Sequence, residues 1–431
     1  MGAVLRLFRS SALLRSSSIY VGSAALNALI LFLLMPVLTR LLEPQQYGVV
    51  ATLASLVALV SVVVGLNTHG LASVQYSRAD RETFRASVGA SVGVMTASAI
   101  ATAIVFVLAS DAIAEATGVT RQWQWTVVVA AAGKFALALT LTVWQVQGFA
   151  LRYGAWQVTA STLIIGLTLV LVAWAGMGWE GYAIAHSMVA AALGTVGLVL
   201  VARSGMLTLR FSRDHLQQAL RFGLPLLPHT LAGVAMATMD RLILAGVVGP
   251  GETGMYFVAF QISSVLVVFG GAVNQAWAPW LFGHLSRGDA AAKARVVAAT
   301  YALFGTFAVA ALVLAVSGPL LVRILAGERY VAAADLLPIL CPAAALTGMY
   351  YLVGNYFIYA KRTGLLSILT IAAAVVQATL TVALAMSRGT AGVAFATLAS
   401  AALYLCLTWY VASRLVPMPW LRRSSRNGSL E

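Results

Sequence analysis

Twelve long apolar runs are the feature that most constrains how this 431-residue chain can fold. Each run is long enough to cross a bilayer as a helix, which takes about 20 apolar residues. Strand-like alternation is absent, and lipid tolerates only helices and closed barrels, because every backbone group must find a partner. The sequence therefore predicts an all-α integral membrane protein with spans at 17–38, 49–71, 87–109, 126–147, 155–176, 182–202, 224–248, 255–281, 297–321, 333–358, 365–386 and 390–412.

The basic residues predict the orientation of these spans. Twenty of the 27 Lys and Arg residues fall on one side of the predicted topology and five on the other, while Lys134 and Arg241 fall inside spans. Because cytoplasmic loops carry the excess of Lys and Arg, we expect both termini in the cytoplasm. The net charge of +14 is spread over short loops, which favours contact with membrane lipids and argues against binding of nucleic acid.

Six spans, a basic break and six further spans indicate a duplicated half. Pro44 and Gly48 follow the first span, and Pro250 and Gly254 follow the seventh at the same spacing. Such parallel repeats place a substrate between the halves, and rocking of one half against the other gives alternating access. The predicted organisation is a cytoplasmic segment at 1–16, a six-helix bundle at 17–202, a cytoplasmic linker at 203–223, a second bundle at 224–412 and a basic cytoplasmic tail at 413–431.

Several function classes are excluded by what the loops lack. No loop is long enough for an independent catalytic domain. The HExxH, GxxxxGK[ST] and GxSxG patterns are absent, so we expect no enzyme and no catalytic residues. The five histidines and two cysteines are dispersed, and they predict neither a metal site nor a bound cofactor. The function class that remains is transport driven by an ion gradient or by the gradient of the substrate.

Lys134 is a charge inside the fourth span. It lies about 12 Å from the start of that span, at 1.5 Å per residue. An ammonium facing lipid at this depth costs at least ~2.5–3.5 kcal/mol, so the side chain should face protein or a wet cavity. We predict that Lys134 binds substrate; the alternative is a snorkelling or paired lysine with a structural role.

Asp240 and Arg241 are neighbouring charges inside the seventh span. Adjacent helix positions point about 100° apart, so we expect these two side chains not to share one partner. Asp240 and His229 lie on one stripe, and a carboxylate and an imidazole facing a cavity could titrate during transport. We predict that Arg241 binds substrate and that Asp240 and His229 couple transport to H⁺ or Na⁺. The alternative for Asp240 is a structural pair with another cation, such as Lys134.

Five further residues are predicted to contact substrate. Asn67 and His69 lie near the inner end of the second span, and Arg40 lies at an outer cavity mouth. Tyr350 and Asn355 belong to an aromatic face of the tenth span, where rings could stack on sugars. Packing or interface anchoring is the alternative for each of them.

Four segments resemble the Wzx-type polysaccharide transporters of the multidrug/oligosaccharidyl-lipid/polysaccharide (MOP) superfamily. Residues 35–48 read MPVLTRLLEPQQYG, and residues 222–229 read FGLPLLPH. Residues 240–244 read DRLIL, and residues 254–256 read GMY. The resemblance implies two six-helix bundles in a V shape around a positively charged central cavity. It further implies a flippase that moves undecaprenyl-diphosphate-linked oligosaccharide repeat units from the inner to the outer leaflet of the bacterial cytoplasmic (inner) membrane.

The resemblance carries over to three residues. Arg40 and Arg241 match recurrent basic positions of the family, and Asp240 matches the acid before the second of these. Lys134 matches no motif of the family. We expect a monomer that binds a lipid-linked anionic oligosaccharide, with an envelope polymerase or glycosyltransferases as partners. The alternatives are a MATE-type drug/cation antiporter, which would need an acidic cavity, and a membrane scaffold that transports nothing.

Overall fold

The computed structural model describes residues 19–420, except residues 21, 24, 28, 31, 78 and 288. The segment predicted at 1–16 and residues 421–431 of the predicted tail lie outside this part. All elements in the described part are helical. The helices long and apolar enough to span a membrane are α2 (Pro44–Val63), α4 (Arg81–Leu108), α6 (Trp125–Val146), α7 (Ala150–Leu169), α8 (Gly178–Arg203), α9 (Arg213–Val247), α10 (Pro250–Arg287), α11 (Ala290–Val316), α13 (Leu337–Tyr359) and α14 (Thr363–Leu415).

Shorter elements join these helices or precede them. A shorter apolar helix at Ala25–Leu41 occupies the place of the first predicted span. The connecting elements are η1 (Thr68–Gly70), α3 (Leu71–Gln75), α5 (Ser110–Thr117), η2 (Arg121–Trp123), the π-helical η3 (Val170–Trp174), α12 (Gly318–Leu325) and η4 (Glu328–Leu336).

The element α14 contains two of the predicted spans. Gly389, at φ 57° and ψ −139°, interrupts the helical backbone between them. This conformation is open to glycine because it has no Cβ. The spans predicted at 365–386 and 390–412 therefore lie on either side of a break, and the all-α fold class is confirmed.

The second predicted span, 49–71, is wrong as a continuous helix. α2 ends at Val63, and three consecutive residues, Gly65, Leu66 and Asn67, have positive φ angles of 83°, 49° and 58°. L-residues disfavour this left-handed region, so the right-handed helix cannot continue through it. The chain resumes as the short turn η1 and then as α3.

Local caps set the start of several helices. The Asp80 carboxylate accepts a hydrogen bond from the Thr83 backbone N–H at 2.7 Å, which begins α4. The Ser212 hydroxyl accepts from the His215 backbone N–H and begins α9. The linker predicted at 203–223 is therefore non-helical only at 204–212.

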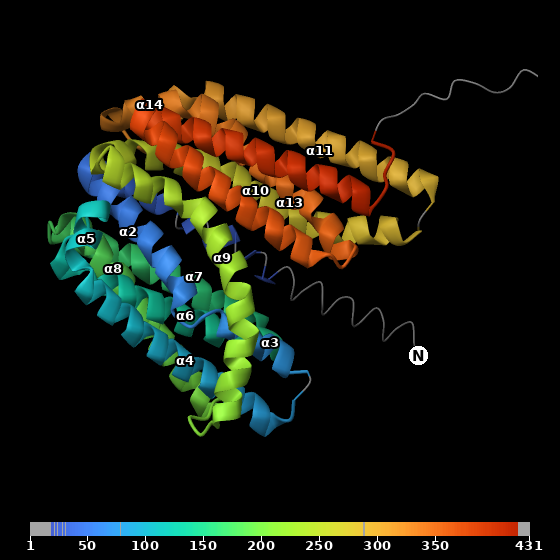
Figure 1. Cartoon of the computed structure of the whole chain (residues 1–431). Coiled ribbons are helices and arrows are strands. Elements are labelled where there is room, and N and C mark those ends of the chain that lie inside the picture. Colours follow the sequence, from blue (N-terminus) through green and yellow to red (C-terminus); the bar gives the residue numbers. More distant parts are fainter. Residues whose placement is uncertain are drawn as a thin grey trace, which may run out of the picture.

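Figure 1 shows two helical bundles that diverge from a shared end. The N-terminal bundle consists of α2 to α8, and the C-terminal bundle consists of α10 to α14. α9 belongs to both bundles: its Gly223 packs against the Leu66 carbonyl beside the break after α2, whereas farther along Met236 accepts a hydrogen bond from Gln377 of α14. Pro225 and Pro228 lie inside α9, between these two contacts.

The two bundles meet at the closed end through a reciprocal glycine contact. A Cβ added to Gly48 would lie 1.7 Å from the Pro250 carbonyl oxygen, and one added to Gly254 would lie 2.1 Å from the Pro44 carbonyl oxygen. Any side chain larger than hydrogen would therefore force α2 and α10 apart. We call these four residues the glycine clasp; they are the two matching motifs of the sequence repeat.

Candidate functional site

Hydrogen bonds between the bundles reinforce the closed end. Arg40 donates through Nη2 to the Ile324 carbonyl oxygen at 3.1 Å. The Tyr330 hydroxyl donates to the Leu42 carbonyl oxygen at 3.0 Å, and its ring lies edge to face with that of Tyr47 at 5.9 Å. Arg40, which the sequence predicts at a cavity mouth, thus ties the first helix to α12.

A cavity of about 350 Å³ lies inside the C-terminal bundle, between α9, α10, α13 and α14. We call it the C-bundle cavity. It brings together two predicted residues, His229 of α9 and Tyr350 of α13. The polar groups that share its walls are Ser263, Ser264, Thr347, Tyr351, Thr370, Gln377, Thr397 and Tyr404.

Hydrogen bonds and ring contacts fix several of these walls. The Thr370 and Tyr404 hydroxyls lie 2.7 Å apart, and the Tyr404 and Tyr350 rings lie 4.3 Å apart. Gln377 donates through Nε2 to the Met236 carbonyl oxygen at 2.9 Å. Hydroxyls, an amide and an imidazole therefore surround one space, and such groups can bind a polar ligand or a cation.

Asp240 and Arg241 form a buried ion pair beside this cavity. Their side chains are 2% and 7% exposed, and Arg241 Nε lies 3.3 Å from Asp240 Oδ1. Helix spacing did not predict this contact, because the long arginine side chain folds back along its own helix and also donates to the Ala237 carbonyl oxygen. The pair is internal to α9, so the alternative partner Lys134 is excluded.

Side chains from α10 and α14 complete this arrangement. The Tyr256 hydroxyl donates to Asp240 Oδ2 at 2.6 Å and lies 3.2 Å from the Thr397 hydroxyl, which lines the C-bundle cavity. The Arg241 guanidinium lies 4.2 Å from the centre of the Phe260 ring, another wall of the cavity. Two hydroxyls and one ring therefore separate the ion pair from the cavity.

Lys134 lies in the N-terminal bundle, half-buried between α6 and α8. Its ammonium is near enough to the His186 imidazole of α8 to act on it electrostatically. Among the described residues no carboxylate lies within 4.0 Å of Lys134. Lys134 is therefore a cation without a carboxylate partner among these residues, and the nearby His186 has a buried Nδ1 without a hydrogen-bond partner.

Asn67 and His69 lie at the break after α2. Asn67 Nδ2 and His69 Nδ1 are buried without a hydrogen-bond partner, and the His69 ring lies edge to face with Phe135 at 5.6 Å. The Phe135 ring of α6 therefore packs on the break, and the residue before it along α6 is Lys134. Gly65 donates its backbone N–H to the Ser98 hydroxyl of α4 at 2.8 Å, which supports the break.

Asn355 takes part in helix packing. It is 4% exposed and donates through Nδ2 to Asn274 Oδ1 at 2.6 Å, which joins α13 to α10. Among the residues that sequence reasoning missed, Tyr256, Gln377 and Thr397 stand out. Each is one of several polar residues in a long apolar helix, and hydropathy alone does not distinguish it from the others.

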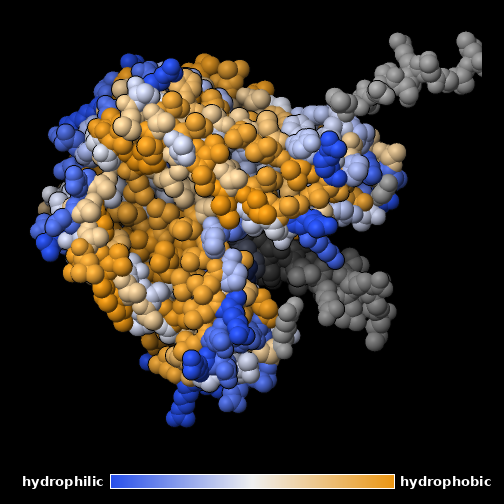
Figure 2. Space-filling model, viewed as in Figure 1, coloured by the Kyte–Doolittle hydropathy of each residue, from blue (hydrophilic) through white to orange (hydrophobic). Residues whose placement is uncertain are grey.

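The surface between the bundles differs from that of the bundle ends. Figure 2 shows mostly hydrophobic residues on the walls visible between the bundles, and hydrophilic residues at the ends. Asp240 and Arg241 are the only charged side chains that are buried in the described part of the chain. Within that part, no group of three or more His, Cys, Asp or Glu residues could hold a metal ion.

Solved structures share this fold. The lipid II flippase MurJ in an inward closed conformation matches with a TM-score of 0.74 and 13% identity, over 93% of this chain and 87% of that one. A multidrug resistance MATE family transporter of the MOP superfamily, in an inward-facing conformation, has a TM-score of 0.64 and 17% identity, over 93% and 94% of the two chains. The mutant Vibrio cholerae MATE transporter VcmN has a TM-score of 0.59 and 14% identity, over 94% and 98%.

The chain therefore shares the fold of these membrane transporters. The profile of the family described as "Polysaccharide biosynthesis protein" matches residues 13–285, which is more than half of the sequence, and the chain belongs to that family. The search of curated protein sequences finds no match. The solved neighbours are transporters and a flippase, which agrees with the expectation that this chain is not an enzyme.

Proposed function

We propose that this protein flips a polyprenyl-diphosphate-linked oligosaccharide from the inner to the outer leaflet of the bacterial cytoplasmic membrane by alternating access. The family match supports a role in polysaccharide biosynthesis, and two bundles that diverge from one end are suited to alternating access. The sugar and diphosphate must cross between the bundles, while the prenyl chain stays in lipid.

The contacts between the bundles support the access mechanism. The glycine clasp and the hydrogen bonds of Arg40 and Tyr330 hold the bundles together at one end. The distribution of basic residues assigns this end to the outer face, so the present conformation would load from the cytoplasm. Transport then requires this end to separate while the opposite end closes.

Lys134 is the single observation that favours an anionic cargo. A half-buried ammonium without a carboxylate partner is costly inside a membrane, and a passing diphosphate would offset that cost. Arg241 is less suited to the same task, because Asp240 already neutralises it. We therefore assign the direct contact with the diphosphate to Lys134, and we assign further polar contacts to Asn67 and His69 of the same bundle.

Asp240 and His229 are the candidates for coupling to H⁺ or Na⁺. His229 lines the C-bundle cavity, and Asp240 is joined to that cavity through the hydroxyls of Tyr256 and Thr397. An ion that entered the cavity would compete with Arg241 for the Asp240 carboxylate. Because α9 also contacts the N-terminal bundle, a change in this pair could be transmitted to both bundles.

The test uses Lys134→Gln in proteoliposomes that contain a fluorescent polyprenyl-diphosphate-linked sugar. Access of a membrane-impermeant quencher reports flipping. We expect the rate to fall about tenfold or more, since one charge-assisted contact to the cargo is worth ~1.5–3 kcal/mol. Lys134→Arg keeps the charge and should retain most activity, and the exposed Arg388→Gln serves as the control. If Lys134→Gln flips the substrate at the wild-type rate, Lys134 does not contact the diphosphate.

A MATE-type antiporter is the second candidate, because MATE transporters share the fold and Asp240 is a buried carboxylate next to a cavity with aromatic walls. A cationic drug would need that carboxylate to be free, and the Arg241 contact opposes this. Expression in a drug-sensitive host separates the two candidates. Resistance that is lost in Asp240→Asn and kept in Lys134→Gln would favour the antiporter.

A further inference from the structure

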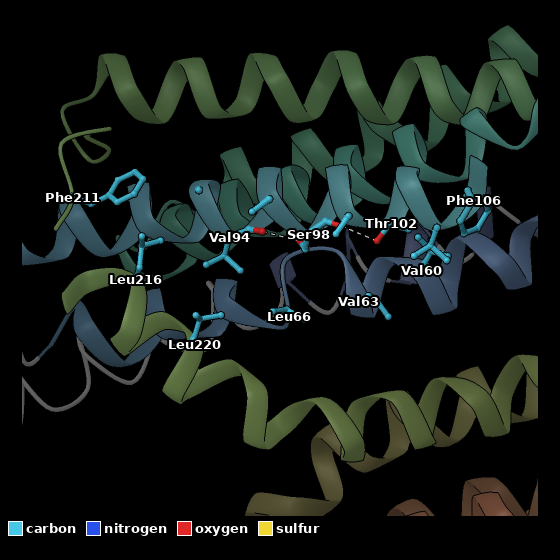
Figure 3. Close-up of a pocket in the computed structure, with 14 residues that line it drawn as sticks. Val60, Val63, Leu66, Val94, Ser98, Thr102, Phe106, Phe211, Leu216 and Leu220 are labelled. Atoms are coloured by element: carbon cyan, nitrogen blue, oxygen red, sulfur yellow. Dashed lines mark hydrogen bonds between the residues drawn. The ribbon is translucent and has the colours of Figure 1, made fainter. Parts of the chain in front are cut away.

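A long apolar groove lies on the N-terminal bundle, away from the polar groups described above. It encloses about 850 Å³ and runs along α4, with α2 and the start of α9 as its other walls. Figure 3 shows Phe211, Leu216 and Leu220 at one end of the groove and Phe106 and Val60 at the other. Polar groups in its lining are limited to the hydroxyls of α4, and these donate to backbone carbonyls of their own helix. We call this feature the α4 groove.

Small residues explain why this side of α4 is hollow. Gly93, Ala97 and Ala101 follow one another at intervals of four, so they lie on one face of the helix. Phe211 approaches this face so closely that a Cβ on Gly93 would lie 2.8 Å from its ring. From Gly93 to Val105 the face extends about 18 Å, at 1.5 Å per residue. These dimensions suit an extended hydrocarbon chain.

Two arginines lie at the start of α4, before the groove begins at Gly93. They are Arg81 and Arg85, in the first two turns of the helix. Arg85 has a buried Nε without a hydrogen-bond partner, and its carbonyl oxygen accepts from the Thr208 backbone N–H at 3.3 Å. This contact holds the linker, and the start of α9, against the end of the groove.

Five arginines gather in these segments: Arg81, Arg85, Arg210, Arg213 and Arg221. Three carboxylates occur there as well: Asp80, Glu82 and Asp214. The described residues contain no ion pair between these two sets. The Thr83 backbone N–H lowers the pKa of Asp80, whose ionised carboxylate is engaged as the cap of α4. The excess of positive charge is therefore available to a ligand, and we call these five residues the α4 arginine cluster.

We propose that the α4 groove holds the prenyl chain of the lipid-linked substrate while the α4 arginine cluster binds its diphosphate, so that this surface is the loading site on the cytoplasmic leaflet. The inference rests on the proposed function and names a substrate subsite for it. Apolar contact alone gives little preference inside a membrane, because lipid tails are as apolar as the groove. Selection therefore depends on the headgroup, and a diphosphate carries more negative charge than the single phosphate of a phospholipid.

The position of α9 gives this surface a route to the interior. Leu216 and Leu220 of α9 form one wall of the groove, and two residues later Phe222 and Gly223 contact the residues around the break after α2. A headgroup leaving the arginine cluster along α9 would therefore arrive beside Asn67 and His69. The prenyl chain could remain in the groove during this step, since it need not leave the hydrocarbon layer.

The test uses the full-length protein in nanodiscs of zwitterionic lipid, with geranylgeranyl diphosphate that carries a photoreactive diazirine on its chain. Labelled peptides are identified by mass spectrometry. We expect the label on the α4 segment around Val94 to Val105 and on the start of α9. Unlabelled geranylgeranyl diphosphate should compete, and excess phosphatidylglycerol should not. Equal competition by phosphatidylglycerol would mean that an ordinary membrane lipid occupies the groove, and it would overturn the proposal.

Two sets of variants sharpen this test. Ala101→Trp fills the groove and should reduce α4 labelling about tenfold, whereas Ala308→Trp, in an apolar groove of about 570 Å³ between α11 and α13, should leave it unchanged. Arg85→Gln with Arg213→Gln alters the cluster without adding bulk to the helix interface. It should lower labelling by a similar factor and remains informative if Ala101→Trp does not fold. Unchanged labelling in the arginine variant would contradict the proposal.

The outcomes also separate this inference from the proposed function. If the probe labels residues between the bundles, and Ala101→Trp flips the lipid-linked sugar at the wild-type rate, the loading site is wrong and the flippase stands. If wild-type protein neither takes the label nor flips the lipid-linked sugar, both fail.

Discussion

Removal of one member of the buried pair Asp240–Arg241 should have a large effect on stability. Arg241→Met would leave the Asp240 carboxylate buried without its cation, and breaking a buried pair in this way costs about 3–5 kcal/mol. The midpoint of thermal unfolding of the purified protein should be clearly lower for this variant than for wild type. The exposed Arg388→Met should unfold like wild type.

The double variant Asp240→Asn with Arg241→Met completes a double-mutant cycle for this pair. It removes both charges, so it should be more stable than Arg241→Met alone. Tyr256 can still donate to the oxygen of the new amide, which keeps one hydrogen bond of the site. If the loss of unfolding free energy in the double variant equals the sum of the losses in Asp240→Asn and Arg241→Met, Asp240 and Arg241 do not stabilise one another.

Individual site residues were predictable only where charge or periodicity set them apart. The stripe through His229 on α9 does line a cavity, and Tyr350 reaches the same space from α13. Gln377 and Thr397 complete that cavity from α14, more than 130 residues from His229, and nothing in a single sequence links such distant positions. The contact of Arg241 with Asp240 depends on the folded-back conformation of the arginine, which helix spacing does not describe.

At the scale of elements, the break after α2 depends on Gly65. A Cβ there would lie 2.1 Å from the Phe135 ring, and the backbone has φ +83°. Gly65→Ala should therefore cost more than the ~1–2 kcal/mol of a left-handed residue, because α6 must also move. Gly148→Ala is the matched control, since Gly148 has φ +78° with nothing within 4 Å of its Cβ position. The midpoints of thermal unfolding are measured for both variants. If Gly65→Ala and Gly148→Ala lower the midpoint equally, packing against Phe135 contributes nothing.

Hydropathy alone hides a break of this kind. The break lies in residues 65–70, which read GLNTHG; two glycines and an asparagine there are turn formers, but the apolar residues before them make the window look continuous. The capping residues Asp80 and Ser212 begin α4 and α9 several residues before the starts at 87 and 224 that hydropathy predicts. Helix existence was therefore predictable across the chain, whereas interruption in the middle of a span was not.

At the scale of the whole molecule, the sequence indicates a repeat of the two halves because both copies keep the same spacing of proline and glycine. The lengths of the apolar runs predicted the long helices that the structure contains. The sequence could not show that the two copies touch, since a contact between α2 and α10 joins residues about 200 positions apart. The closed end therefore required coordinates, and it is the feature on which the alternating-access mechanism can be tested most directly.

A reversible disulfide across the closed end tests whether that end must open. A Cβ on Gly251 would lie 3.5 Å from the Gln45 side chain, a separation compatible with a disulfide between Gln45→Cys and Gly251→Cys once Cys341 and Cys406 are replaced by alanine. Oxidation should reduce flipping in proteoliposomes to the background of empty liposomes, and dithiothreitol should restore it. Each single-cysteine variant controls for the substitutions and should flip equally with and without oxidant. If the cross-linked protein flips at the wild-type rate, the closed end stays shut throughout transport, and the cargo must reach the outer leaflet without separation of α2 from α10.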